Sequence, residues 1–109
     1  MKGLTKTLSM LSLAMKAGKV KSGEFAVTEE IKKGTAYLVI VADDASDRTK
    51  KTYKDSCAFY DVPMYTYSDM ESLGRALGKE FRAAVAITDE NFAKGIVDKI
   101  SEEKNKTEE

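Results

Sequence analysis

The residues best suited to chemistry lie between Ala17 and Gly34, in the sequence AGKVKSGEFAVTEEIKKG, which holds four lysines and three glycines. Ser22 is predicted to cap a short helix here. The first backbone N–H groups of that helix would lack partners inside it and would carry the positive end of its dipole. Gly23 has no Cβ, so a ligand could approach closely, and Lys19 and Lys21 add positive charge beside it. This arrangement could bind an anion such as a phosphate group, although a well-capped surface helix would show the same residues.

Composition excludes several classes of protein. The chain has 109 residues and a mass of 12.0 kDa, which predicts a single domain over residues 1–100. It has no histidine and one cysteine, Cys57, which excludes a Cys/His zinc site, a disulfide within the chain and catalysis by imidazole. We therefore expect no enzymatic activity, no cofactor and no metal. No apolar run reaches the roughly 18 residues of a membrane-spanning helix, which favours a cytoplasmic protein with no membrane partner.

Charge is balanced over the whole chain and uneven along it. Eighteen basic residues cancel eighteen acidic ones. Residues 1–34 nevertheless hold seven lysines against three glutamates, whereas residues 68–109 hold seven basic residues against ten acidic ones. The last nine residues, SEEKNKTEE, include no apolar residue, so we expect a disordered, charged tail over residues 101–109.

Helical periodicity places apolar residues on one face of five segments. The residues on these faces are Leu4, Leu8, Leu11 and Met15; Val27 and Ile31; Thr49, Tyr53, Cys57 and Tyr60; Met70, Leu73 and Leu77; and Phe92, Ile96 and Ile100. Glu30 is expected on the solvent side of the second segment, which Gly34 ends in the left-handed region. Ser68 and Glu71 have the spacing of a capping box at the start of the fourth segment. Gly74 lies inside that segment, where glycine lowers helix stability by roughly 1 kcal/mol relative to alanine. A close packing contact or a nearby ligand would explain why glycine stands there.

Strands are expected between these helices. The run Tyr37–Ala42 is apolar and β-branched, as in a strand buried on both faces, and Ala83–Thr88 is similar. Val20 fits a very short extended piece, and the step at Val62-Pro63 favours a strand that continues to Tyr67. The alternation predicts an α/β fold, a three-layer α/β/α sandwich with a small mixed, mostly parallel sheet of about four strands.

Motifs for nucleotides and metals are weak. The sequence GKVKSG has the glycine spacing of a phosphate-binding loop, but Glu24 and Phe25 stand where that motif requires Lys and Ser or Thr. No G-x-G-x-x-G sequence occurs, so we expect no small-molecule substrate. Asp43 and Asp44 are similar to a metal-binding pair, yet Asp44 is also placed to cap the next helix.

Five segments in order resemble a known family. They are AGKVKSGE, LVIVADDAS, the pair Val62-Pro63, LGRALGKE and AVAITDENFA, and together they span roughly Leu8–Ile96. This order resembles the kink-turn RNA-binding ribosomal proteins of archaea and eukaryotes, and more closely their bacterial YlxQ-like branch. The resemblance implies the same α/β/α sandwich. It also implies a structured RNA as partner, either rRNA or another bulged or kinked RNA, and the ribosome as a candidate assembly.

The resemblance also implies where RNA would bind. In the RNA-binding members the helix entrance reads Gly-x-Asn-Glu-x-x-Lys and recognises sheared G·A pairs. This sequence keeps Gly23 but has Phe25, Ala26 and Glu29 at the Asn, Glu and Lys positions. Lys33 matches a later basic position, and residues 79–82 fall on a loop that in the family packs against an extruded nucleotide. The residues implied for RNA binding are Lys21, Ser22, Gly23, Glu24, Phe25, Lys33, Lys79, Glu80, Phe81 and Arg82.

The functional prediction is a non-enzymatic RNA-binding protein of ribosomal type, ribosome-associated or an assembly accessory, with degenerate kink-turn recognition. This prediction depends on whether the side chain of Phe25 is exposed. An exposed Phe25 could stack on an unpaired base, whereas an inward-facing one would belong to the core. The alternative is a protein-interaction module on the same fold that has lost RNA binding.

Overall fold

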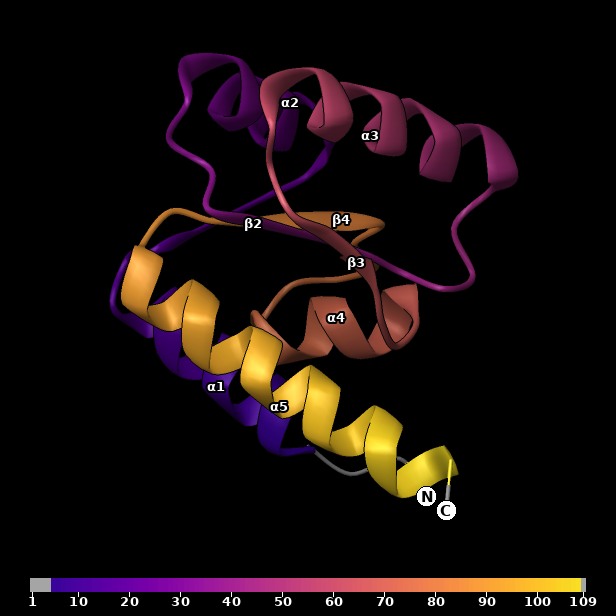
Figure 1. The fold of residues 1–109 in the computed structure, drawn as a ribbon. Coiled ribbons are helices and arrows are strands. Elements are labelled where there is room, and N and C mark those ends of the chain that lie inside the picture. The colour runs from indigo at the N-terminus through magenta and orange to yellow at the C-terminus, as the bar shows by residue number, and fades with distance from the viewer. Residues whose placement is uncertain (1–4, 109) are drawn as a thin grey trace.

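A four-stranded sheet lies between two layers of helices in the computed structural model, which describes residues 5–108 (Figure 1). The strands are β1 (Val20–Ser22), β2 (Leu38–Val41), β3 (Met64–Thr66) and β4 (Ala84–Ile87). The helices are α1 (Lys6–Lys16), α2 (Glu24–Lys33), α3 (Asp47–Tyr60), α4 (Met70–Ala76) and α5 (Glu90–Glu108). Helices α2 and α3 cover one face, and α1, α4 and α5 cover the other, which confirms the predicted sandwich. None of these helices has an apolar stretch long enough to cross a membrane.

The sheet has the order β1-β4-β2-β3, so β1 and β3 form its two edges. β4 pairs antiparallel with both β1 and β2, and β2 pairs in parallel with β3. The predicted mixed sheet of about four strands is present, but parallel pairing is the minority, contrary to the expectation of a mostly parallel sheet. Alternation along the sequence identifies the strands, whereas the direction of each strand depends on how its connection crosses the sheet.

The core is built on the two central strands. Every residue of β2 and β4 is buried, because helices cover both faces of the sheet there. Val27 and Ile31 of α2 and Leu8 and Leu11 of α1 pack into this core as the periodicity predicts, while Leu4 lies outside the described residues. Burial of these aliphatic side chains supplies the main stabilising contribution, about 1.5–3 kcal/mol for each large one.

The inner face of α3 ends earlier than its apolar spacing predicts. Tyr53 and Cys57 are buried, and burial raises the pKa of the Cys57 thiol to about 11. Tyr60, expected on the same face, leaves 40% of its surface exposed. It is the last residue of α3, next to Asp61, which caps the helix in the left-handed region.

Two helices begin differently from the prediction. Ser22 does not cap α2; it is the last residue of β1, and Gly23, with a φ of 94°, precedes the helix without a side-chain cap. The capping box of Ser68 with Glu71 is also wrong, because Ser68 adopts a φ of 62° and Asp69 caps α4 with its carboxylate. In both cases the extended or turning backbone continues one residue further than the sequence spacing indicates.

Asp44 caps a different helix from the one expected. Its Oδ1 accepts the backbone N–H of Met70 at 2.9 Å, at the start of α4, while Ser46 caps α3. The carboxylate of Asp44 therefore ties the loop after β2 to the helix after β3. Among the side chains that the structure describes, no group of three or more from histidine, cysteine, aspartate or glutamate is arranged to hold a metal ion.

Residues 101–108 are helical rather than disordered, since α5 continues to Glu108. The carboxylate of Glu103 accepts hydrogen bonds from Tyr67, at 2.7 Å, and from the hydroxyl of Thr7. The Tyr67 hydroxyl also lies 2.7 Å from the hydroxyl of Thr5, which caps α1. Because Tyr67 has one proton and gives it to Glu103, Thr5 is the donor in that second contact. The chain of hydrogen bonds joins the start of α1, the end of β3 and the second half of α5.

We predict that Glu103→Ala lowers the free energy of unfolding by about 1–3 kcal/mol, because the Tyr67 and Thr7 hydroxyls lose their acceptor. Glu102→Ala is the matched control. Glu102 is exposed, and its 3.7 Å ion pair with Lys99 lies at the surface, so its loss should cost at most about 1 kcal/mol. Urea unfolding of both variants measures the difference. Equal effects would show that the end of α5 does not depend on this contact.

Gly74 faces the backbone of the loop that follows α4. A Cβ at this position would lie 1.7 Å from the carbonyl oxygen of Glu80 and 2.5 Å from its carbonyl carbon. The loop is also tied to the helix by a 2.8 Å hydrogen bond from the Lys79 N–H to the Gly74 carbonyl. The close packing contact predicted from the mid-helix glycine is confirmed.

Gly74→Ala is therefore expected to destabilise the fold by about 1–3 kcal/mol or more, since backbone atoms would have to move. Gly95→Ala makes the same change inside α5. Its Cβ would meet the end of the flexible Met10 side chain at 2.8 Å, which can rotate away, and alanine gains helix propensity there. Thermal and urea unfolding should therefore show a loss for Gly74→Ala and little change or a gain for Gly95→Ala. The reverse order would contradict this packing.

Candidate functional site

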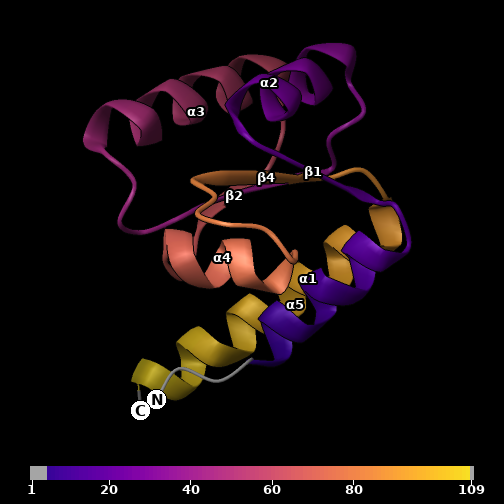
Figure 2. The same ribbon diagram turned by 180° about the vertical axis from the view of Figure 1, so that it is seen from behind.

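Two segments far apart in the sequence meet at the entrance of α2 (Figure 2). Arg82 Nε donates a hydrogen bond to Ser22 Oγ at 3.2 Å, and the N–H of Gly23 donates to the Ala84 carbonyl at 3.3 Å. The N–H of Arg82 in turn donates to the carbonyl of Met70 in α4 at 3.1 Å. We call the surface made by residues 21–25 and residues 79–82 the α2-entrance surface.

The rigid scaffold below this surface explains its position. β1 pairs with β4 from Val20↔Ile87 to Ser22↔Val85, so the residues just after β1 lie beside the residues just before β4. Gly74 allows the loop at Glu80 to lie against α4, as described above. The sheet register and this close packing together bring both segments to one edge of the molecule.

One exposed aromatic side chain stands on each segment. Phe25, in the first turn of α2, exposes 81% of its surface, and Phe81, in the loop, exposes 67%. Phe25 is two residues before the buried Val27, about 200° away around the helix, which points it to solvent. Phe25 is therefore not part of the core.

Charges of both signs surround the two aromatic rings. Lys21 and Lys79 are exposed, and Arg82 is half-buried and held by its contacts to Ser22 and to the Phe81 carbonyl. Glu24 and Glu80 are exposed on the same surface. The carbonyl of Glu24 accepts a 3.3 Å hydrogen bond from Tyr53 of α3, which fixes the first turn of α2.

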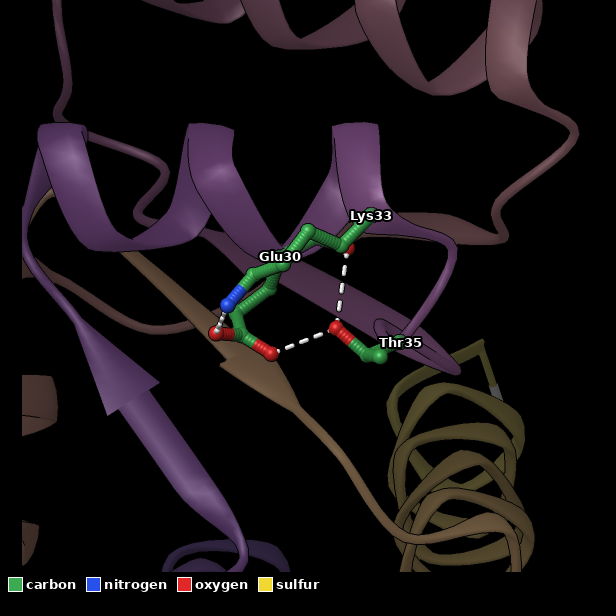
Figure 3. Close-up of polar contacts among 3 residues, drawn as sticks. All are labelled: Glu30, Lys33 and Thr35. Atoms are coloured by element: carbon green, nitrogen blue, oxygen red, sulfur yellow. Dashed lines mark hydrogen bonds and ion pairs between the residues drawn. The ribbon is translucent and has the colours of Figure 1, made fainter.

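Lys33 is not part of this cluster. It lies nine residues after Glu24 on α2, about 14 Å along the helix axis at 1.5 Å per residue. Its Nζ is 3.5 Å from Oε2 of Glu30 (Figure 3). The structure thus brings together nine of the ten residues implied by the family resemblance in the two segments that meet, and places Lys33 at the far end of the helix.

Glu30 is buried although it was expected on the solvent side of α2. Its Oε1 accepts a 2.5 Å hydrogen bond from the hydroxyl of Thr35 (Figure 3). This hydrogen bond lowers the pKa of Glu30, and the charges of Lys33 and Lys21 lower it further, against burial, which raises it. The sequence did contain one indication of this burial: Glu30 lies three residues after Val27, at the edge of the apolar face of α2.

The family of the chain follows from comparison with known proteins. Residues 5–97 match the ribosomal protein L7Ae/L30e/S12e/Gadd45 family, and the chain belongs to this family. Within it, the chain is similar to the RNA-binding protein YlxQ of Bacillus subtilis (strain 168), with 43% identity over 88 residues that cover 81% of this chain and 88% of that protein. The resemblance inferred from the five sequence segments is confirmed.

Two further relatives extend the comparison. The RNA-binding protein YlxQ of Enterococcus faecium is 37% identical over 89 residues, covering 82% of this chain and 85% of that protein. The large ribosomal subunit protein eL8 of Cenarchaeum symbiosum (strain A) is 32% identical over 99 residues, covering 85% of this chain and 75% of that protein.

Solved structures share the fold. A protein with unknown function from Bacillus halodurans C superposes with a TM-score of 0.86 at 34% identity, covering 89% of this chain and 98% of that one. The Giardia lamblia 15.5kD RNA binding protein has a TM-score of 0.73 at 24% identity, covering 86% of this chain and 83% of that one. At that identity the second comparison supports the α/β/α fold alone.

The lowered pKa of Glu30 predicts an acid-dependent contribution to stability. A carboxylate whose pKa is lower in the folded state stabilises the fold above its unfolded pKa, about 4.3 for glutamate, and this contribution is lost as the pH falls through the folded pKa. Glu30→Gln should therefore unfold more easily than the wild type at neutral pH, and the difference should vanish in acid. Urea unfolding across a pH series measures it, with the exposed Glu29→Gln as control. A difference that stays constant with pH would contradict the role of the charge.

Proposed function

We propose that the protein binds structured RNA through the α2-entrance surface. The observation that carries this proposal is that Arg82 and Ser22 join two segments which each present an exposed phenylalanine. Large exposed aromatic side chains often mark a binding site, and an unstacked base is one partner that can stack on a π face. The names of the YlxQ relatives as RNA-binding proteins support the same partner class.

Recognition would rest on stacking and phosphate contacts. Each base stacked on Phe25 or Phe81 contributes about 1–3 kcal/mol without requiring a particular base. Lys21 and Lys79 would contact phosphates on either side, and Arg82 would position the loop. Glu24 would disfavour a phosphate directly over the helix entrance, so bases rather than backbone would face that point.

Kink-turn readout is expected to be degenerate. Phe25, Ala26 and Glu29 replace the Asn, Glu and Lys that the family uses at this entrance, and neither an aromatic ring nor a methyl group can make the same hydrogen bonds to G·A pairs. A bulged hairpin with unpaired bases should bind as well as a kink-turn. Lys33, paired with Glu30, would reach only a more distant phosphate.

The role we infer is that of a non-enzymatic, ribosome-associated or assembly accessory protein. Similarity to a large ribosomal subunit protein supports an rRNA partner. The aromatic and basic residues of the α2-entrance surface stand on β1, the first turn of α2 and the loop after α4, a rigid arrangement that suits binding without chemistry.

Fluorescence anisotropy with a bulged RNA hairpin tests the proposal. Lys21→Glu with Lys79→Glu should weaken binding and reduce the slope of log Kd against log salt by about 0.7–0.9 for each lost phosphate contact. The matched control is Lys54→Glu, an exposed lysine on α3. Phe25→Ala and Phe81→Ala should instead raise Kd about 5-fold or more with little change in slope, because stacking releases no counterions.

Stability measurements separate binding from folding. Phe25→Ala should leave the free energy of unfolding within about 0.5 kcal/mol of the wild type, because the ring is exposed. Tight binding selective for a kink-turn would contradict the degenerate readout. Failure to bind the hairpin, the kink-turn and rRNA alike would overturn the proposal of an RNA-binding surface.

A further inference from the structure

A second exposed apolar region lies at the opposite edge of the sheet from the α2-entrance surface. It is a groove of about 620 Å³ between the end of α3, the start of β2 and the first half of α5. β3 is the edge strand on this side, and β1 is the edge strand on the other. Figure 1 shows β3 in front of the sheet, and Figure 2, turned by 180°, shows β1 in front.

The walls of the groove are apolar and partly exposed. The lining includes Tyr37 before β2, Tyr60 at the end of α3, Val62 and Pro63 in the connection to β3, and Val97 of α5. Tyr37 exposes 47% of its surface, and Tyr60 exposes 40%. The volume falls within the roughly 300–1,000 Å³ of sites that bind small molecules or side chains.

The apolar surface also continues beyond the groove. Phe59 exposes 80% of its surface, and its ring meets the ring of Tyr60 edge-on with centroids 4.9 Å apart. A ligand that covers both the groove and Phe59 must be longer than the groove itself. This favours an extended segment of a polymer over a compact small molecule.

The charges that line the groove indicate which kind of polymer it would bind. The groove is lined by the carboxylates of Asp61, Glu90 and Asp98 against the single ammonium of Lys94. The carbonyl end of the α3 dipole points here, and the last turn of α3 has no basic residue to offset it. Glu90 lies in the first turn of α5, where the helix dipole partly offsets its charge. The net field is negative, which repels RNA phosphates and attracts cations.

We propose that this groove binds a basic protein segment, one in which lysine or arginine residues flank apolar or proline side chains. The apolar side chains would enter between Tyr60 and Val97, and the cations would pair with Asp61 and Asp98. Because the groove and the α2-entrance surface lie at opposite edges, the segment would bind without displacing RNA.

The test uses a short fluorescein-labelled peptide of lysine, leucine and proline residues with the full chain. Two further peptides replace the lysines with glutamate or the apolar residues with serine. We expect saturable binding of the first peptide and at least about fivefold weaker binding of the other two. Equal binding of all three, or no binding of the first, would overturn the proposal.

Variants of the protein locate the site. Asp98→Lys and Tyr37→Ser should each raise the peptide Kd at least about fivefold, and Lys94→Glu should lower it, because that change makes the groove more acidic. Phe81→Ala, at the other edge, should leave it unchanged. Since Asp98 and Lys94 are both exposed, opposite shifts from these two changes cannot come from unfolding. Shifts in the same direction would overturn the assignment.

Two further measurements test the other occupants. RNA affinity should be the same for Tyr37→Ser and the wild type, because this change alters no charge, so a loss of RNA binding would overturn the choice of a protein ligand. Sedimentation of the free protein should show a monomer. A dimer abolished by Tyr37→Ser would mean that the groove serves a second copy of the chain. The peptide result is independent of RNA binding, so either proposal can fail alone.

Discussion

The backbone of Glu80 passes so close to α4 that only a glycine fits opposite it, at Gly74. This contact fixes the loop between α4 and β4 against the layer of helices below the sheet. The hydrogen bond from the Arg82 N–H to the Met70 carbonyl holds the other end of the same loop. With both ends fixed, Phe81 and Arg82 have a defined position beside β1. The candidate RNA surface therefore depends on a steric constraint at Gly74, which lies outside the surface and contacts the backbone of Glu80 within it.

The spacing of apolar residues in the sequence was enough to predict the core and most of the helices and strands. The uninterrupted apolar runs around Val39 and Val85 specify strands buried on both faces, and the spacing of Val27 and Ile31 specifies which side of α2 faces them. Ser22 and Ser68 were assigned to the wrong roles because the propensity of a serine to cap a helix does not say whether the preceding strand or turn has ended. The spacing of apolar residues likewise does not say in which direction each strand runs, so the antiparallel pairing of β4 was not predicted.

Two hydrogen-bonded carboxylates, the buried Glu30 and the partly buried Glu103, were the other kind of error. Glu30 and Glu103 lie in charged stretches, EEIKK and SEEKNK, which read as solvated. Glu30 accepts a hydrogen bond from the hydroxyl of Thr35, just beyond the end of α2, and Glu103 accepts one from the hydroxyl of Tyr67, just after β3. Glu30 lies three residues after Val27, at the edge of the apolar face, but the hydrogen bonds of Glu103 leave no periodic signal in the sequence. For the site, local spacing indicated that the entrance of α2 could bind an anion, but the pairing of that entrance with residues 79–82 came only from resemblance to a family.

The zero net charge of the chain conceals a separation of charge between two edges of one sheet. On the α2-entrance surface Lys21, Lys79 and Arg82 outnumber Glu24 and Glu80 by one charge, whereas in the groove Asp61, Glu90 and Asp98 outnumber Lys94 by two. In the proposed function, this difference would attract an RNA to the α2-entrance surface and disfavour it at the groove. The same difference would favour the approach of the proposed cationic segment to the groove. A strongly basic protein of this size would hold RNA more tightly but at more places, and balanced charge therefore favours a single mode of binding over overall affinity.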